Sequence, residues 1–192
     1  MKKTSLLLLV CLAFTVAVKA QEFKKFKVAV GGGYASPAGS GAKGGVLFYI
    51  EPAYRIQDNI SVGLRWEQAL VVRGFSEDVP SGVDLNIAGI GSYTLNGQYY
   101  FNNNNFRPFV GLGFGIYNLA AVKYDAGGQT DQVAVASGSK VGFYPRVGFD
   151  LNHFNVSIDY NVVGATKADG GGEFKNSYLG VRIGGSFGGG RK

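Results

Sequence analysis

Eight charged side chains are spaced along the sequence so that they could form ion pairs with one another. Four are carboxylates and four are guanidinium groups, so the set carries no net charge. Each falls on the less apolar side of a segment in which apolar and polar residues alternate, a pattern typical of strands with one buried face. The set consists of Glu51, Arg55, Arg65, Glu67, Arg146, Asp150, Asp159 and Arg182. We interpret it as a charge network that neutralises itself inside an enclosed space.

Two contacts within this set follow from the turns between segments. If the chain pairs symmetrically about Asp58, Glu51 lies directly opposite Arg65, with about 5 Å between Cβ atoms. Across a second tight turn, Arg146 lies near Asp159 on a diagonal. The alternative is that these pairs are exposed on a soluble sheet, where each would contribute at most about 1 kcal/mol.

The sequence offers little for catalysis or for metal and cofactor binding. His153 is the only histidine, and the nearest serine on the following strand, Ser157, belongs to no matching motif; nucleophilic catalysis needs the base within reach of its serine. Residues 39–44 match a dinucleotide-binding pattern, but a strand follows them where that motif needs a helix. Asp125 and Asp131 lack the ligand density of a calcium loop. We therefore expect no catalytic residue, no cofactor and no metal site.

Strands must position the charged residues, because period-two alternation dominates the chain after residue 20. The whole chain holds 31 Gly, 14 Phe and 11 Tyr, a composition that favours strands over helices. Eight strands are predicted, at residues 26–34, 45–56, 60–72, 83–101, 108–122, 140–151, 155–164 and 176–187.

The connections between these strands alternate in length. Those at residues 57–59, 102–107 and 152–154 are short, whereas those at 73–82, 123–139 and 165–175 are long and contain turn residues. Short turns at one rim and long loops at the other are typical of an outer-membrane barrel. An even number of strands places both termini at the short-turn rim, which would be periplasmic.

The direction of the apolar face decides between a soluble barrel and a membrane barrel. The apolar face would fill the inside of a soluble barrel, whereas in a membrane barrel it meets lipid. Here that face carries large residues such as Trp66 and Phe114 and no Lys or Arg at its centre, where a charge would cost roughly 2–4 kcal/mol. We predict an all-β fold, an eight-stranded antiparallel up-and-down transmembrane β-barrel. Its periplasmic aromatic girdle would include Tyr54, Tyr99, Phe101 and Tyr160.

The first 20 residues have the pattern of a cleaved signal peptide. Lys2 and Lys3 precede an uncharged run that is too short for a membrane-spanning helix, and residues 18–20 offer a small-residue cleavage site. We therefore expect residues 1–20 to be the signal peptide and residues 21–192 to be one barrel domain. Cleavage removes the single cysteine, Cys11, and three lysines, so the formal charge falls from +6 to +3, which argues against a nucleic-acid partner.

Two segments resemble strands of the small outer-membrane β-barrel proteins, the group that includes the OmpA barrel domain and the OmpX and OmpW types. One is Arg107-Pro108-Phe109-Val110-Gly111-Leu112-Gly113, and the other is the ending at residues 178–187. The resemblance implies a location in the outer membrane of a Gram-negative bacterium, contact with its lipid, and recognition of the last strand by the barrel assembly machinery. The tail at residues 188–192 departs from members that stop at the aromatic, and it resembles the tails of Bacteroidota members.

Four functions remain open from the sequence. The first is a non-enzymatic, monomeric barrel with a structural role, or with a surface role in which the long loops bind an extracellular ligand. The second is a narrow porin-like channel for small solutes, although eight strands enclose a lumen that side chains just fill. The third is a lipid A-modifying enzyme with His153 as base, and the fourth is a soluble barrel that carries a hydrophobic ligand.

Overall fold

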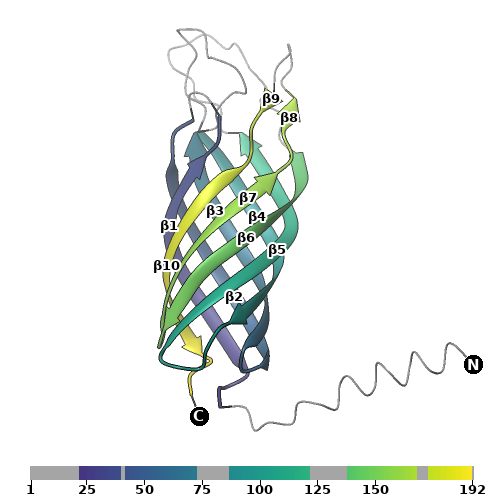
Figure 1. The fold of residues 1–192 in the computed structure, drawn as a ribbon. Helices are drawn as coiled ribbons and strands as arrows, with labels where there is room; N and C mark the ends of the chain where they lie inside the picture. The colour runs from purple at the N-terminus through teal and green to yellow at the C-terminus, as the bar shows by residue number, and fades with distance from the viewer. Residues whose placement is uncertain (1–21, 40–41, 73–86, 122–137, 168–172, 192) are drawn as a thin grey trace, which may run out of the picture.

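The wall of the molecule is a tall β-barrel of eight strands (Figure 1). The structure is a computed structural model that describes residues 22–39, 42–72, 87–121, 138–167 and 173–191. The wall strands are β1 (Phe26–Pro37), β2 (Gly45–Gln57), β3 (Ile60–Val72), β4 (Ile87–Tyr100), β5 (Phe106–Ala121), β6 (Gly138–Leu151), β7 (Phe154–Val163) and β10 (Tyr178–Gly188). A separate small sheet lies beyond the wall. It consists of two antiparallel strands of two residues each, β8 (Thr166–Lys167) and β9 (Glu173–Phe174).

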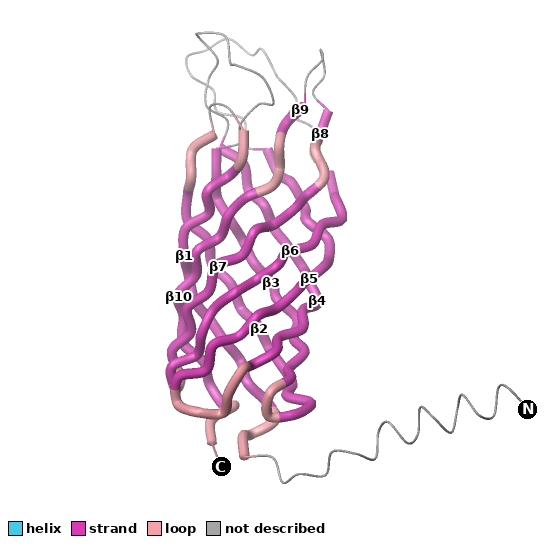
Figure 2. Tube along the Cα trace, viewed as in Figure 1, coloured by secondary structure: helices cyan, strands magenta, loops and turns pink. Residues whose placement is uncertain are grey.

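The sheet closes on itself in the order β1-β10-β7-β6-β5-β4-β3-β2, and each strand is antiparallel to its neighbours. The first and last strands complete the ring, with Val30 opposite Gly185. The connections at residues 58–59, 101–105 and 152–153 lie at one end of the barrel, together with both ends of the described chain (Figure 2). We call this end the short-turn rim and the opposite end the long-loop rim.

The prediction of eight strands in up-and-down order is confirmed. The third strand has the predicted bounds. The largest difference within the described residues is at β1, which continues to Pro37 instead of ending at Tyr34, and β5 begins two residues early and contains Pro108. Pro108 accepts a hydrogen bond from the backbone N–H of Phe101 at 3.0 Å, so its side without an N–H faces the end of β4, where the ladder stops. The hairpin β8–β9 was not predicted. Residues 1–20, residues 83–86 and most of the three long loops lie outside the described residues.

The large apolar side chains point away from the lumen, as predicted. Trp66, Phe48 and Phe114 are 51%, 63% and 59% exposed, although such residues are normally buried in soluble proteins. The alternating positions face inward and are buried; they include Arg65, Glu67, Arg146 and Asp159. The exterior is therefore an apolar belt and the interior is polar, which is the arrangement of a barrel surrounded by lipid. Within the described ranges, no helix is long and apolar enough to cross a membrane.

Of the four aromatic residues predicted for the girdle, three lie near the short-turn rim. Tyr54, Tyr99 and Phe101 are exposed near the short-turn rim, and the rings of Tyr99 and Phe101 meet edge to face at 5.6 Å between centroids. Tyr160 does not lie near this rim. Strand β7 runs from the short-turn rim at Phe154 to Val163, and Tyr160 lies in the half that is nearer to the long-loop rim.

The described segments before β1 and after β10 both fold against the short-turn rim. Gly188 and Gly189 have positive φ values of 72° and 64°, a conformation that glycine adopts without strain, and they turn the tail away from β10. The tail then meets the segment before β1: Lys24 donates its backbone N–H to Gly190 at 2.9 Å, and Phe23 forms a bridge with Arg191. The residues after the last strand thus partly cover the base of the barrel.

Candidate functional site: the charged lumen

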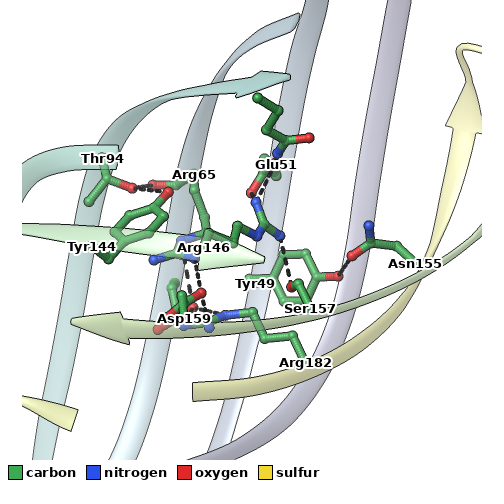
Figure 3. Close-up of polar contacts among 12 residues, drawn as sticks. Tyr49, Glu51, Arg65, Thr94, Tyr144, Arg146, Asn155, Ser157, Asp159 and Arg182 are labelled. Atoms are coloured by element: carbon green, nitrogen blue, oxygen red, sulfur yellow. Dashed lines mark hydrogen bonds and ion pairs between the residues drawn. The ribbon is translucent and has the colours of Figure 1, made fainter. Parts of the chain in front are cut away.

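The centre of the lumen holds two guanidinium groups and two carboxylates in mutual contact. Figure 3 shows three of the four residues, Arg65, Arg182 and Asp159. Arg65 on β3 donates from Nη1 to Asp159 Oδ2 on β7 at 2.9 Å. Arg182 on β10 donates to the same Asp159 oxygen, and from Nε to Glu67 Oε2 on β3 at 2.7 Å. None of these four residues is more than 2% exposed. A buried charge is tolerated only when it is paired, so this group is stable only as a set.

A second ion pair lies beside the first. Arg146 on β6 donates from Nη1 to both oxygens of Glu51 on β2, at 2.9 and 2.8 Å. Two neutral side chains add hydrogen bonds to this pair. Gln98 donates to Glu51 at 2.7 Å, and Arg146 donates from Nη2 to Ser157 at 3.2 Å (Figure 3). The charges of Glu51 and Arg146 therefore balance without help from the central group.

The ion pairs join different partners from those that the sequence predicted. The register of β2 on β3 is symmetric about Asp58, as predicted, which puts Glu51 and Arg65 at facing positions. Arg146 is directly opposite Asp159 rather than diagonal to it. Nevertheless Glu51 pairs with Arg146 and Arg65 pairs with Asp159.

These two pairs cross the lumen from side to side. In the closed sheet, β2 and β6 are four strands apart, and so are β3 and β7, which makes each pair of strands diametrically opposite. Inward side chains converge on the axis of a narrow barrel, so a long Arg reaches across the lumen as readily as it reaches its neighbour. We call these two ion pairs the cross-lumen pairs.

Tyrosines and amides complete the polar filling of the lumen. Tyr178 donates to Glu67 at 2.6 Å, Tyr117 donates to Asn161 at 2.8 Å, and the Arg65 guanidinium lies 3.8 Å from the centroid of the Tyr144 ring. A Cβ atom at Gly113 would overlap the ring of Tyr144. Glycine at this position therefore leaves room for a large side chain in the lumen.

Asp150 lies in a third group, near the short-turn rim. It accepts hydrogen bonds from Lys27 at 2.5 Å, Tyr100 at 3.0 Å and Asn155 at 2.5 Å. Arg55, which was predicted to belong to the charge network, is only 4% exposed, but it forms no ion pair with a described residue. Its Nη1 donates instead to the backbone oxygen of Gly189 at 2.9 Å.

Sequence reasoning missed two cations of this third group. Lys27 faces inward because it alternates with Phe26 and Val28, and this alternation in the sequence was enough to predict its inward position. Arg107 precedes the predicted strand at residues 108–122, whereas β5 begins at Phe106 and so includes Arg107.

His153 lies in the turn between β6 and β7, as predicted. Its Nδ1 is 2.9 Å from the backbone oxygen of Ser186, and the Ser186 hydroxyl donates to the backbone oxygen of His153. Ser157 bonds to Arg146 instead. Among the described residues, no group of three or more His, Cys, Asp or Glu side chains is placed to hold a metal ion. Asp125 and Asp131 lie outside that part of the chain.

Comparisons with known proteins agree with this geometry. A family model described as "outer membrane protein beta-barrel domain" matches residues 6–187. Neisserial surface protein A has a similar structure, with 19% identity, a TM-score of 0.57 and coverage of 84% of this chain and 94% of that one. The outer-membrane protein OprG from Pseudomonas aeruginosa is also similar, with 17% identity, a TM-score of 0.52 and coverage of 88% and 100%. No curated protein matches the sequence.

Proposed function

Because the chain belongs to the family of outer-membrane protein β-barrel domains, we propose that it is a non-enzymatic integral protein of the outer membrane with a structural or surface-interaction role. One observation carries this proposal: the outside of the barrel is apolar while the ionic groups are buried within it. Such a surface is stable only in lipid or detergent.

The proposed orientation puts the short-turn rim and both termini in the periplasm. The long-loop rim would then face outward, with residues 73–82, 123–139 and 165–175 as the contact loops. The unequal loop lengths support this arrangement, because the longer loops of outer-membrane barrels are extracellular. We propose that the protein acts as a monomer, that the assembly machinery recognises β10, and that the host belongs to the Bacteroidota.

Outer-membrane fractionation tests the location. We expect the protein to remain with the outer membrane and to need detergent for release, because its belt is apolar. We also expect the unheated protein to migrate differently from the boiled protein on a denaturing gel, since a closed barrel with buried ion pairs stays folded until it is heated. Recovery from the soluble periplasm without detergent would instead support a soluble carrier.

Planar-bilayer recordings test whether the lumen conducts. We expect no steady single-channel steps from the refolded wild-type protein, because the cross-lumen pairs and the tyrosines occupy the space that eight strands enclose. A detergent-only addition is the control. Steady, reproducible steps would contradict a sealed lumen and favour the narrow channel.

The contacts of His153 also support a non-enzymatic role. A catalytic serine must present its hydroxyl to the ring nitrogen of the base. The contacts between His153 and Ser186 each use a backbone oxygen as one partner. A lipid A-modifying activity would predict a changed lipid A mass on deletion of the gene, and we expect that mass to stay the same.

A further inference from the structure

A cavity of about 190 Å³ opens at the short-turn rim, below the lumen network. Its lining includes Lys27, Arg55, Arg107, Arg191 and His153, but only one carboxylate, Asp150. A water molecule needs only about 10–15 Å³ by the same measure, so the cavity has room for a small ion with its hydration. We call this cavity the mouth.

Two of these cations, Arg55 and Arg107, form no direct ion pair with a carboxylate of the described residues. Lys27 is paired with Asp150, and Arg191 is paired with Glu22 at 3.0 Å. Arg55 and Arg107 form no ion pair with any residue in the described ranges, and their hydrogen bonds go to neutral oxygens, including Gly189 O, Asn102 O and the backbone oxygen of Asp58. In addition, Nε of Arg55 is buried and has no hydrogen-bond partner among those residues.

The two unpaired guanidinium groups share the same aromatic neighbours. Their central carbons lie 4.7 Å (Arg55) and 4.1 Å (Arg107) from the ring centroid of Phe23, and 5.9 Å and 4.2 Å from that of Tyr100. Aromatic faces attract cations, but they do not cancel the repulsion between two like charges held beside the same rings. An anion between the two groups would cancel it.

The wider electrostatics of the rim favour an anion as well. The carboxylate of Asp58 already accepts the backbone N–H groups of Glu22 and Phe23, at 3.0 and 3.3 Å. Lys24 and Lys25 are exposed on the segment that leads into β1 and add positive charge near the opening. Fixed positive charge around a concave opening raises the local concentration of anions.

We propose that the mouth binds a small, soluble, divalent oxyanion of the phosphate class, held between Arg55 and Arg107. Two guanidinium groups offer several N–H donors in planar forks, which match the multiple oxygens of such an ion better than the single charge of chloride. The site lies inside the barrel rather than on its lipid face, so the ligand is a free anion and not a lipid headgroup. This site is separate from the proposed surface role of the loops.

Calorimetric titration of the refolded mature protein in zwitterionic detergent tests the proposal. Inorganic phosphate is the probe, and acetate at equal ionic strength is the comparison. We expect saturable binding of phosphate, and a fall of about tenfold or more in affinity for Arg55→Gln, because charge-assisted hydrogen bonds are lost. Lys140→Gln is the matched control: it also removes one positive charge, but on β6 near the long-loop rim, and should change the affinity less than about twofold.

Three results would overturn the site. They are no saturable phosphate binding by the wild type, acetate binding as tight as phosphate binding, or equal losses in Arg55→Gln and Lys140→Gln. Heat-modifiable migration checks that each variant is folded, and Arg107→Gln replaces Arg55→Gln if the latter fails that check. As a second readout, phosphate should raise the urea midpoint of the wild type more than acetate does.

Discussion

Replacing Arg182 with methionine should destabilise the folded barrel by about 3–5 kcal/mol, the usual cost of removing one partner from a buried ion pair. Arg182 is fully buried and contacts both Glu67 and Asp159. Without it, two buried carboxylates share the single guanidinium of Arg65. Methionine keeps much of the side-chain length, so the loss reports charge more than an empty cavity. Urea unfolding in detergent micelles, followed by tryptophan fluorescence, measures the free energy of unfolding.

Two further variants make this prediction specific. Arg191→Met breaks a pair whose side chains are 59% and 50% exposed, and should change the free energy of unfolding by no more than about 1 kcal/mol. Adding Glu67→Gln to Arg182→Met removes one excess negative charge and should restore at least about 1 kcal/mol of the loss. If Arg182→Met and Arg191→Met had equal effects, the buried group would contribute no more than a surface pair.

Replacing Phe114 with arginine should cost roughly 2–4 kcal/mol in a lipid bilayer, because the charge would lie near the middle of the hydrocarbon layer. Phe114 is 59% exposed and lies midway along β5, with Leu95 and Phe143 opposite it on the neighbouring strands. Reversible unfolding from phospholipid vesicles measures the cost.

Phe106→Arg is the matched control, since the residue type and the strand are the same. Phe106 is 50% exposed and begins β5 at the short-turn rim, roughly 26 Å along the strand from Phe114 at about 3.3 Å per residue. There the arginine can reach the interface, and the cost should fall to about 0–1 kcal/mol. Equal costs at the two positions would argue that Phe114 does not lie at the centre of a membrane.

The strands and their orientation could be predicted because each depends on local sequence. Alternation such as Leu64, Trp66 and their polar neighbours assigns a face to every residue of a strand, and a one-residue slip would reverse all of them. Tight turns such as the one at Asp58 then fix the register between neighbours. The charges alone indicated which face of the strands points into the lumen, because Arg65 and Glu67 could not lie in lipid.

The ion-pair partners could not be predicted in the same way. The backbones of Glu51 and Arg65 do face one another along the wall, but the charged ends of their side chains can contact any group near the barrel axis. Which partner each side chain contacts depends on the diameter of the barrel. It also depends on where the strand tilt places the residues of β6 and β7 along the barrel axis, and the pairing of one strand with its neighbour does not reveal this. The covered base was also beyond sequence reasoning, because Phe23 and Arg191 meet only after the ring has closed.

The cross-lumen pairs also bear on how long the folded protein lasts. Their strands lie on opposite sides of the cylinder, so the two charges of each pair can meet only when nearly the whole wall is in place. Interactions that form so late contribute little to the speed of folding, and their loss appears mainly as faster unfolding. The ionic interior should therefore act chiefly on the lifetime of the inserted protein rather than on the rate at which it assembles.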